Sequence, residues 1–259
     1  LNDINLKKTN NNIQLNSNNF DMGSIIKKSL SGKDKKNFLD IFQNLNSTLN
    51  INIKSAKLDE DHNLNNIKGK SKILKNKIGK TNITAEFDQK NNFTFTKDII
   101  DGKIITIILS DYAKPFVKKF DFIKGFEDGK IDYTSTEINE TLSKSELRIY
   151  DFKLKDMPAL TKLLSLASLQ GIADLATGQG IRFSEFDMYF ESSKNLITIK
   201  EIYALGPAIS ILMEGYVEKN KLISLRGTLV PATTINKMIG SIPILGEILV
   251  GSKTGEGVF

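Results

Sequence analysis

The feature that most constrains this chain is an alternation of apolar and polar residues that returns along most of its length. In the segment 185–191, the apolar residues Phe186, Met188 and Phe190 alternate with polar positions, which include Glu185, Asp187 and Glu191. Successive side chains of a β-strand point to opposite faces, so this spacing predicts a strand with one apolar face. The polar run Ser192-Ser193-Lys194-Asn195 then predicts a turn. Because such units follow one another, we predict a mainly β fold, built as a long antiparallel meander.

Similar alternation marks the other expected strands. It occurs at residues 49–53, 82–87, 92–96, 104–109, 131–135, 197–199, 209–217 and 223–229. The run 126–130, which contains Asp128-Gly129, predicts the turn of a further hairpin before the strand at 131–135. We find no exact sequence repeat, only repeated hairpin signals.

Three segments break the strand pattern and predict helices. They are residues 33–44, residues 156–172 with Pro158 in the first turn, and residues 233–249, interrupted at Pro243. Their apolar residues recur at helical spacing, so we expect two or three short amphipathic helices, one of them near the C-terminus. Such helices pack on a sheet as core, or else cap a groove or touch a membrane.

Composition removes several classes of chemistry. The 259 residues include no cysteine, no tryptophan and a single histidine, His62. A disulfide framework, a zinc ribbon, a thiol nucleophile and a two-histidine metal site within one chain are therefore excluded. We interpret His62, among Asp59, Glu60 and Asp61, as an exposed loop or strand-edge residue. We expect no cofactor, no metal and no catalytic residue.

The motifs that resemble catalytic or phosphate-binding sites are incomplete. Gly69-Lys70-Ser71 and Gly79-Lys80-Thr81 lack the first glycine of a phosphate-binding loop. The carboxylates of Glu185 and Asp187 are predicted to lie on the water-facing side of their strand. A hydrolase would need carboxylates that converge in a pocket, and this alternative stays open.

The net charge of +6 does not indicate nucleic acid. Only three of the 36 basic residues are arginine, which is the residue best suited to bidentate contacts with phosphates and bases. We interpret the lysine and asparagine bias mainly as genome composition, with a smaller contribution from attraction to an anionic membrane surface. No uncharged stretch reaches the roughly 20 residues that span a bilayer. Because the chain begins with leucine, we expect it to be a segment of a longer protein or to begin at an unusual start codon.

Periodicity alone leaves two architectures open. In a compact sandwich, a second sheet buries the apolar face. If the sheet curls without closing, the same face lines an apolar trough suited to acyl chains. Both arrangements satisfy the alternation.

Several motifs of the C-terminal half carry a family resemblance. They include Asp151-Phe152-Lys153-Leu154, Met157-Pro158-Ala159-Leu160, the run from Gly178 to Phe183, Gly206-Pro207-Ala208, Arg226-Gly227-Thr228-Leu229-Val230-Pro231, Ile242-Pro243-Ile244-Leu245-Gly246 and Gly255-Glu256-Gly257-Val258-Phe259. In this order they resemble the C-terminal region of the AsmA-like proteins, especially the YhdP-like branch. The resemblance divides the chain into a polar strand-rich segment with one short helix, residues 1–95, and an AsmA-like C-terminal domain, residues 96–259.

The resemblance implies a fold, a location and a function. The implied fold is a meander curled into an open, β-taco-like groove of the bridge-like lipid-transfer type. The implied location is the periplasm of a Gram-negative bacterium, as part of an inner-membrane-anchored envelope protein whose anchor lies outside this chain. The implied function is non-enzymatic transport of phospholipid or another acyl-chain lipid between inner and outer membranes, with membrane proteins as further partners. A scaffold or outer-membrane protein assembly factor that binds through sheet edges is the alternative.

Two sets of site residues follow from this interpretation. The predicted groove lining consists of Phe186, Met188, Phe190, Ile197, Ile199, Ile209, Ile211 and Met213. The competing interpretation is that these residues form an ordinary core between the sheet and the helices. The residues of the family motifs, expected to shape turns and strands, are Gly178, Gly180, Phe183, Gly206, Gly215, Gly227, Pro231, Pro243, Gly246, Gly255 and Gly257.

Overall fold

The fold was taken from a computed structural model of the chain. It describes residues 3–23, 46–74, 77–87, 91–117, 125–155, 178, 180–218 and 222–231. The predicted helices at 33–44, 156–172 and 233–249 lie outside these described residues. The short helix α2 (Lys114–Val117) was not expected from the sequence.

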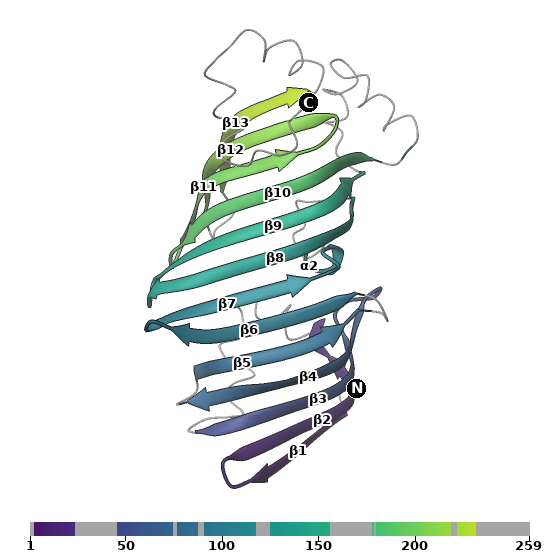
Figure 1. Ribbon diagram of the computed structural model, residues 1–259, viewed down its shortest axis with the longest axis vertical. Helices are drawn as coiled ribbons and strands as arrows, with labels where there is room; N and C mark the ends of the chain where they lie inside the picture. Colours follow the sequence, from purple (N-terminus) through teal and green to yellow (C-terminus); the bar gives the residue numbers. More distant parts are fainter. Residues whose placement is uncertain are drawn as a thin grey trace. The chain divides into compact units, whose positions relative to one another are not determined.

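The described chain forms one sheet of 13 strands (Figure 1). The strands are β1 (Ile4–Thr9), β2 (Asn12–Asp21), β3 (Ser47–Lys57), β4 (Asn63–Leu74), β5 (Lys77–Glu86), β6 (Asn92–Ile100), β7 (Lys103–Ser110), β8 (Phe126–Asn139), β9 (Leu142–Leu154), β10 (Ile181–Ser192), β11 (Leu196–Leu205), β12 (Ile209–Glu218) and β13 (Ile223–Pro231). Their order in the sheet is their order in the sequence, so β1 and β13 are edge strands and the sheet is open. The predicted mainly β meander is confirmed.

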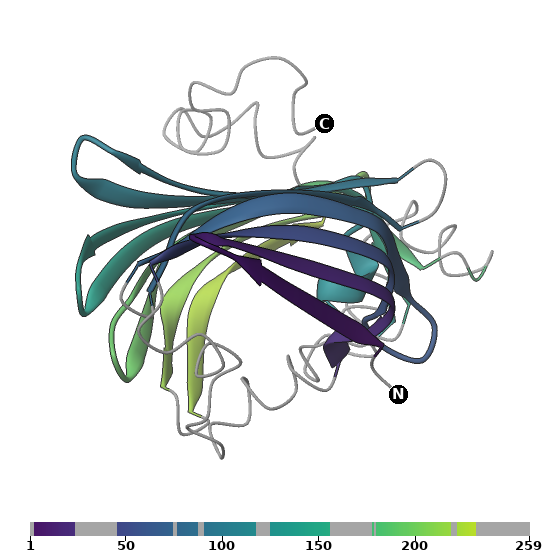
Figure 2. The same cartoon turned by 90° about the horizontal axis from the view of Figure 1, so that it is seen from below.

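Neighbouring strands with described registers are antiparallel, with the exception of β2 and β3. These two run parallel, with Ile13 opposite Leu49 and Leu15 opposite Ile51. A parallel pair needs a connection that returns the chain to the other end of the strand. We did not predict this pair. At the N-terminal edge, β2 is the one described strand that pairs with β1 (Figure 2).

The chain divides into two compact units. Unit 1 contains residues 1–115 and 132–137, and unit 2 contains residues 116–131 and 138–259. Strand β8 therefore contributes to both units.

In unit 1, apolar side chains from successive strands stand opposite one another on one face. Across β2 to β7, one such row is formed by Leu15, Ile51, Gly69, Ile83, Phe95 and Ile108. The side chains of Leu15, Leu49 and Ile73 on this face are buried. Burial of a side chain of this size contributes roughly 1.5–3 kcal/mol.

In unit 2, aromatic rings pack across strands β8, β9 and β10. Phe152 stacks on Phe126 and on Phe183, each with 5.1 Å between ring centroids. The edge of Phe186 meets the same ring. All three stacked rings are buried, so this cluster is part of the unit 2 core.

The hairpin predicted at 126–130 is wrong. These residues belong to the single strand β8, which continues from Phe126 to Asn139. Asp128 and Gly129 both have positive φ, so Asp128-Gly129 interrupts the regular strand without reversing the chain. Lys153 on β9 pairs with Asp128, and Lys155, which follows the end of β9, pairs with Glu127 at this irregularity.

Candidate functional site

All eight residues of the predicted lining lie on one face of β10, β11 and β12. Phe186 stands opposite Ala204, which stands opposite Ile211. Met188, Ile202 and Met213 form the next row of cross-strand partners. Phe190 is paired with Ile199, and Ile197 with Ser192 on β10 and Val217 on β12. Ile209 is two residues before Ile211 and so shares its face. We call these eight residues, with Ile202 and Ala204, the apolar face of unit 2.

An irregularity in β11 keeps this face continuous. The register shifts between Ile199 and Ile202, and both of these side chains are buried. The two residues between them, Lys200 and Glu201, are exposed. Two residues placed together on the polar side restore the alternation, which is the geometry of a β-bulge.

The lining residues differ in how accessible they are. Ile199 and Ile209 are buried and belong to the core. The remaining six are half-buried: Phe186, Met188, Phe190, Ile197, Ile211 and Met213. These six retain apolar surface that a ligand can cover.

The apolar face extends onto residues that the predicted lining omitted. Ile202 and Ala204 are buried within it. On β13, Ile223 and Leu225 stand opposite Val217 and Gly215 and are exposed. The alternation at 223–229 was the signal that could have added them.

Two glycines of the family motifs allow close packing of β12 against β13. A Cβ atom at Gly215 would meet the carbonyl oxygen of Ser224, and one at Gly227 would meet the carbonyl oxygen of Leu212. Gly215 also has a φ of 155°. A larger side chain at either position therefore requires the strands to move apart.

The other motif residues are spread over the unit. Gly178, Gly180 and Gly206 lie outside the strands, Phe183 belongs to the stacked rings, and Pro231 ends β13. Pro243, Gly246, Gly255 and Gly257 lie outside the described residues.

The opposite face of β9 and β10 carries charged and hydroxyl-bearing side chains. Asp187 stands opposite Arg148 on β9 and Tyr203 on β11. Its side chain is 0% exposed, so the prediction that it faces water is wrong. The Arg148 Nε atom lies 3.7 Å from Asp187 Oδ1, and Arg148 also pairs with Glu146. This carboxylate is therefore buried although it lies on the polar face.

Further ion pairs connect the strands on this face. Glu191 on β10 pairs with Lys144 on β9 at 3.5 Å and with Lys200 on β11 at 3.2 Å. Hydrogen bonding from Lys200 is the main cause that lowers the pKa of Glu191. These pairs lie at the surface, and each contributes little to stability.

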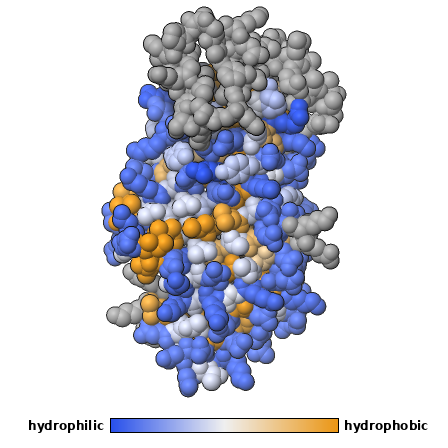
Figure 3. Space-filling view, viewed as in Figure 1, coloured by the Kyte–Doolittle hydropathy of each residue, from blue (hydrophilic) through white to orange (hydrophobic). Residues whose placement is uncertain are grey.

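In unit 1, the face of β6 and β7 opposite to Phe95 and Ile108 also carries apolar side chains. Ile105, Ile107 and Leu109 stand opposite Asp98, Thr96 and Thr94 on β6. Leu109 is exposed, as is Ile100 on the same face. Figure 3 shows apolar side chains gathered over the middle strands of a face that is otherwise mostly hydrophilic.

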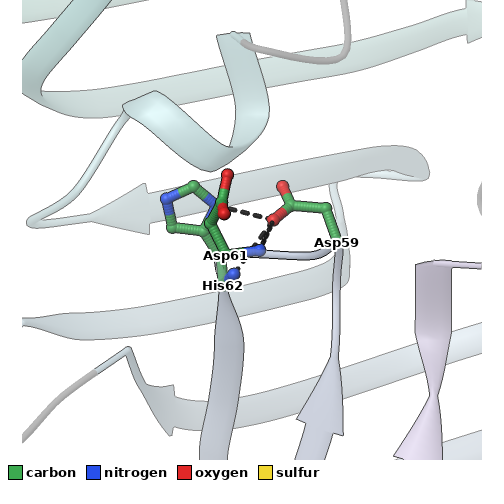
Figure 4. Close-up of side chains that lie close together, drawn as sticks. All are labelled: Asp59, Asp61 and His62. Carbon is green, nitrogen blue, oxygen red and sulfur yellow. Dashed lines mark hydrogen bonds and ion pairs between the residues drawn. The ribbon is translucent and has the colours of Figure 1, made fainter.

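His62 lies in the loop between β3 and β4, together with Asp59 and Asp61 (Figure 4). Asp59 Oδ1 accepts hydrogen bonds from the backbone N–H groups of Asp61 and His62, each at 2.9 Å, and lies 2.7 Å from His62 Nδ1. The loop position was predicted correctly. The predicted exposure was wrong, because the His62 side chain is only 11% exposed and its ring packs beside Tyr112.

The same loop is the one group of possible metal ligands among the described residues. One ligand atom from each of Asp59, Asp61 and His62 lies within 4.8 Å of the others. Burial raises the pKa of Asp59, but hydrogen bonds from Asp61 and His62 outweigh it, and the net effect is a lowered pKa. Asp59 Oδ1 already has hydrogen-bond partners within the loop. These hydrogen bonds account for the conformation of the loop.

No family model, curated protein or solved structure matches this chain. Within the described residues, no helix has both the length and the apolar character needed to cross a membrane.

Proposed function

We propose that this chain is a non-enzymatic part of an AsmA-like, YhdP-like envelope protein that carries phospholipid between the inner and outer membranes. The observation that supports it is the placement of all eight lining residues on one face, in cross-strand register. Six of them are half-buried and so offer apolar surface. In this proposal the apolar face of the open sheet serves as the groove, the chain lies in the periplasm, and the membrane anchor belongs to another part of the protein.

The physical reason for such a face is the cost of exposing acyl chains to water. Each CH₂ group transferred from an apolar environment to water costs about 0.8 kcal/mol. A two-chain phospholipid therefore needs a continuous apolar surface to travel through an aqueous compartment. The face over β10 to β13 supplies one, while the headgroup stays in water at its margin.

A photo-crosslinking experiment tests this proposal. A photoreactive residue at Met188 or Ile211 is expected to capture phospholipid when the protein is incubated with vesicles. The matched control is the same residue at Glu214, which lies on β12 with its side chain on the other face. Equal capture at Ile211 and Glu214, or no capture at any position, contradicts lipid transport by this face.

A second function is supported by the exposed edge strand β1. All six of its residues are exposed, including Ile4 and Leu6, and β2 is its one neighbour in the sheet. Free edges accept further strands, so β1 is the site expected for a scaffold or assembly factor that binds a partner protein. Replacing Leu6 by proline then abolishes capture of envelope proteins, whereas Ile211→Asp leaves it unchanged. The opposite pattern contradicts edge binding.

A further inference from the structure

Two adjacent rows of side chains cross strands β4 to β7 in unit 1, on the same face. One row is Gly69, Ile83, Phe95 and Ile108, and the other is Ser71, Thr81, Lys97 and Thr106. The members of the two rows are two residues apart on each strand, so both rows share a face. An apolar surface therefore lies directly beside a polar one.

Within the polar row, the side chains of Ser71, Thr81 and Lys97 differ in how far they are exposed to solvent. Ser71 and Thr81 are buried and hydrogen-bonded to each other at 2.8 Å. The Lys97 side chain is 21% exposed, and its Nζ atom lies 3.3 Å from Oε1 of Glu137, whose side chain is 43% exposed. Charge-assisted hydrogen bonds are commonly 2.7–2.9 Å long, so this ion pair is loose. Both side chains keep part of their surface exposed.

We propose that the Lys97–Glu137 pair binds the headgroup of a zwitterionic phospholipid that carries a primary ammonium group, with its acyl chains on Phe95, Ile83 and Ile108. This proposal rests on the proposed function and names the lipid class. The phosphate contacts the Lys97 ammonium, and the headgroup ammonium donates hydrogen bonds to the Glu137 carboxylate. The four charges then alternate in sign, and the ion pair need not break.

Charge complementarity selects this headgroup over two others. An anionic headgroup without an ammonium group leaves Glu137 beside the phosphate, and like charges at close range repel. A trimethylated headgroup has a positive charge but no N–H group to donate to Glu137. The ion pair between Lys80 and Asp98 is the matched control, with 2.7 Å between Nζ and Oδ2. Lys80 directly precedes Thr81, and Asp98 directly follows Lys97. Both control residues therefore project to the opposite face of the sheet.

The test uses vesicles with equal amounts of phosphatidylethanolamine, phosphatidylcholine and phosphatidylglycerol, and mass spectrometry of the lipid that stays with the purified protein. The wild-type protein is expected to retain phosphatidylethanolamine about three- to fivefold over each of the others, the size expected for a partly exposed charge pair. Glu137→Gln removes the preference over phosphatidylglycerol, Lys97→Gln reduces all three lipids, and Lys97→Arg keeps the preference. Lys80→Gln and Asp98→Asn leave it unchanged.

The outcomes separate this inference from the proposed function. If the wild-type protein retains lipid without this preference, or if Glu137→Gln keeps it, the inference is overturned and lipid transport stands. If no lipid is retained at all, both are overturned. Glycerophosphoethanolamine, the same headgroup without acyl chains, is expected not to displace the lipid at equal concentration, and displacement would overturn the assignment of a lipid site.

Discussion

At the scale of single residues, the least expected feature is the buried carboxylate of Asp187. Alternation places this residue on the polar face, and the register confirms that placement. Arg148 and Tyr203 are its partners on the neighbouring strands, and its side chain is buried. A pattern within one strand carries no information about the size of cross-strand neighbours, so this burial could not be predicted from residues 181–192 alone.

Asp187→Asn is expected to destabilise the protein by about 1–3 kcal/mol, because it leaves Arg148 without this charged partner and places an amide in a site shaped for a carboxylate. Urea unfolding followed by circular dichroism measures the change. Glu214→Gln is the control, because Glu214 forms an exposed cross-strand pair with Arg226 and its replacement is expected to change stability by less than about 0.5 kcal/mol. Equal effects of the two substitutions would contradict a special role for the buried carboxylate.

The lowered pKa of Asp59 predicts a pH dependence of stability. A carboxylate with a lower pKa in the folded than in the unfolded protein stabilises the fold above its unfolded pKa of about 3.9. This stabilisation is lost as the pH falls through the lower, folded pKa. Wild-type protein is therefore expected to be more stable than Asp59→Asn at pH 6, with the difference shrinking towards pH 2.5 in urea titrations. A difference that is constant over this range would contradict the prediction.

At the scale of elements, prediction worked best where turns are clearly marked. The segment from Phe186 to Met213 alternates regularly and is punctuated by Ser-Ser-Lys-Asn and Gly-Pro, and its strands form as predicted. Strand β4 gave a weaker signal, because Gly69 and Ser71 occupy apolar-face positions and Asn66, with a φ of 51°, interrupts the alternation. The hydrogen bond between Ser71 and Thr81 makes a polar residue acceptable there, and this partner is visible only in the folded sheet.

Gly215→Ala tests the close approach of β12 and β13. The added Cβ meets the Ser224 carbonyl oxygen, and the positive φ adds backbone strain, so we expect a loss of at least about 2 kcal/mol. Gly79→Ala in β5 is the control, because its Cβ would have 3.3 Å to the nearest atom and a smaller adjustment suffices. Thermal unfolding of both variants gives the comparison. A Gly215→Ala protein as stable as wild type would show that the two strands can separate without cost.

At the scale of the whole molecule, the sequence predicted the class of fold and the alternation that places the eight predicted lining residues on one face. It did not predict the parallel join of β2 and β3, because residues 12–21 were not among the expected strands, so the helix expected at residues 33–44 was not interpreted as a connection between two parallel strands. The choice between an ordinary core and a lipid-binding face also needs more than periodicity, since both require the same alternation.

Ile211→Asp separates these two functions of the apolar face. The residue is half-buried, so a charge there is expected to lower lipid retention by about tenfold, while the folded signal in circular dichroism persists. Tyr216→Asp introduces the same charge on the opposite face of β12 and is expected to retain lipid as the wild type does. Complete unfolding of Ile211→Asp would instead identify this position as structural core.

The parallel join of β2 and β3 also has a consequence for the order in which the chain folds. Strands β3 to β7 are sequence neighbours that pair antiparallel, so each join closes a short loop. Strand β2 must instead reach β3 across 25 intervening residues and align in the same direction. Closing a longer loop costs more entropy before any contact rewards it. The β1–β2 hairpin is therefore expected to dock after the β3–β7 meander has formed, and to be the first part of unit 1 to exchange its amide hydrogens with solvent.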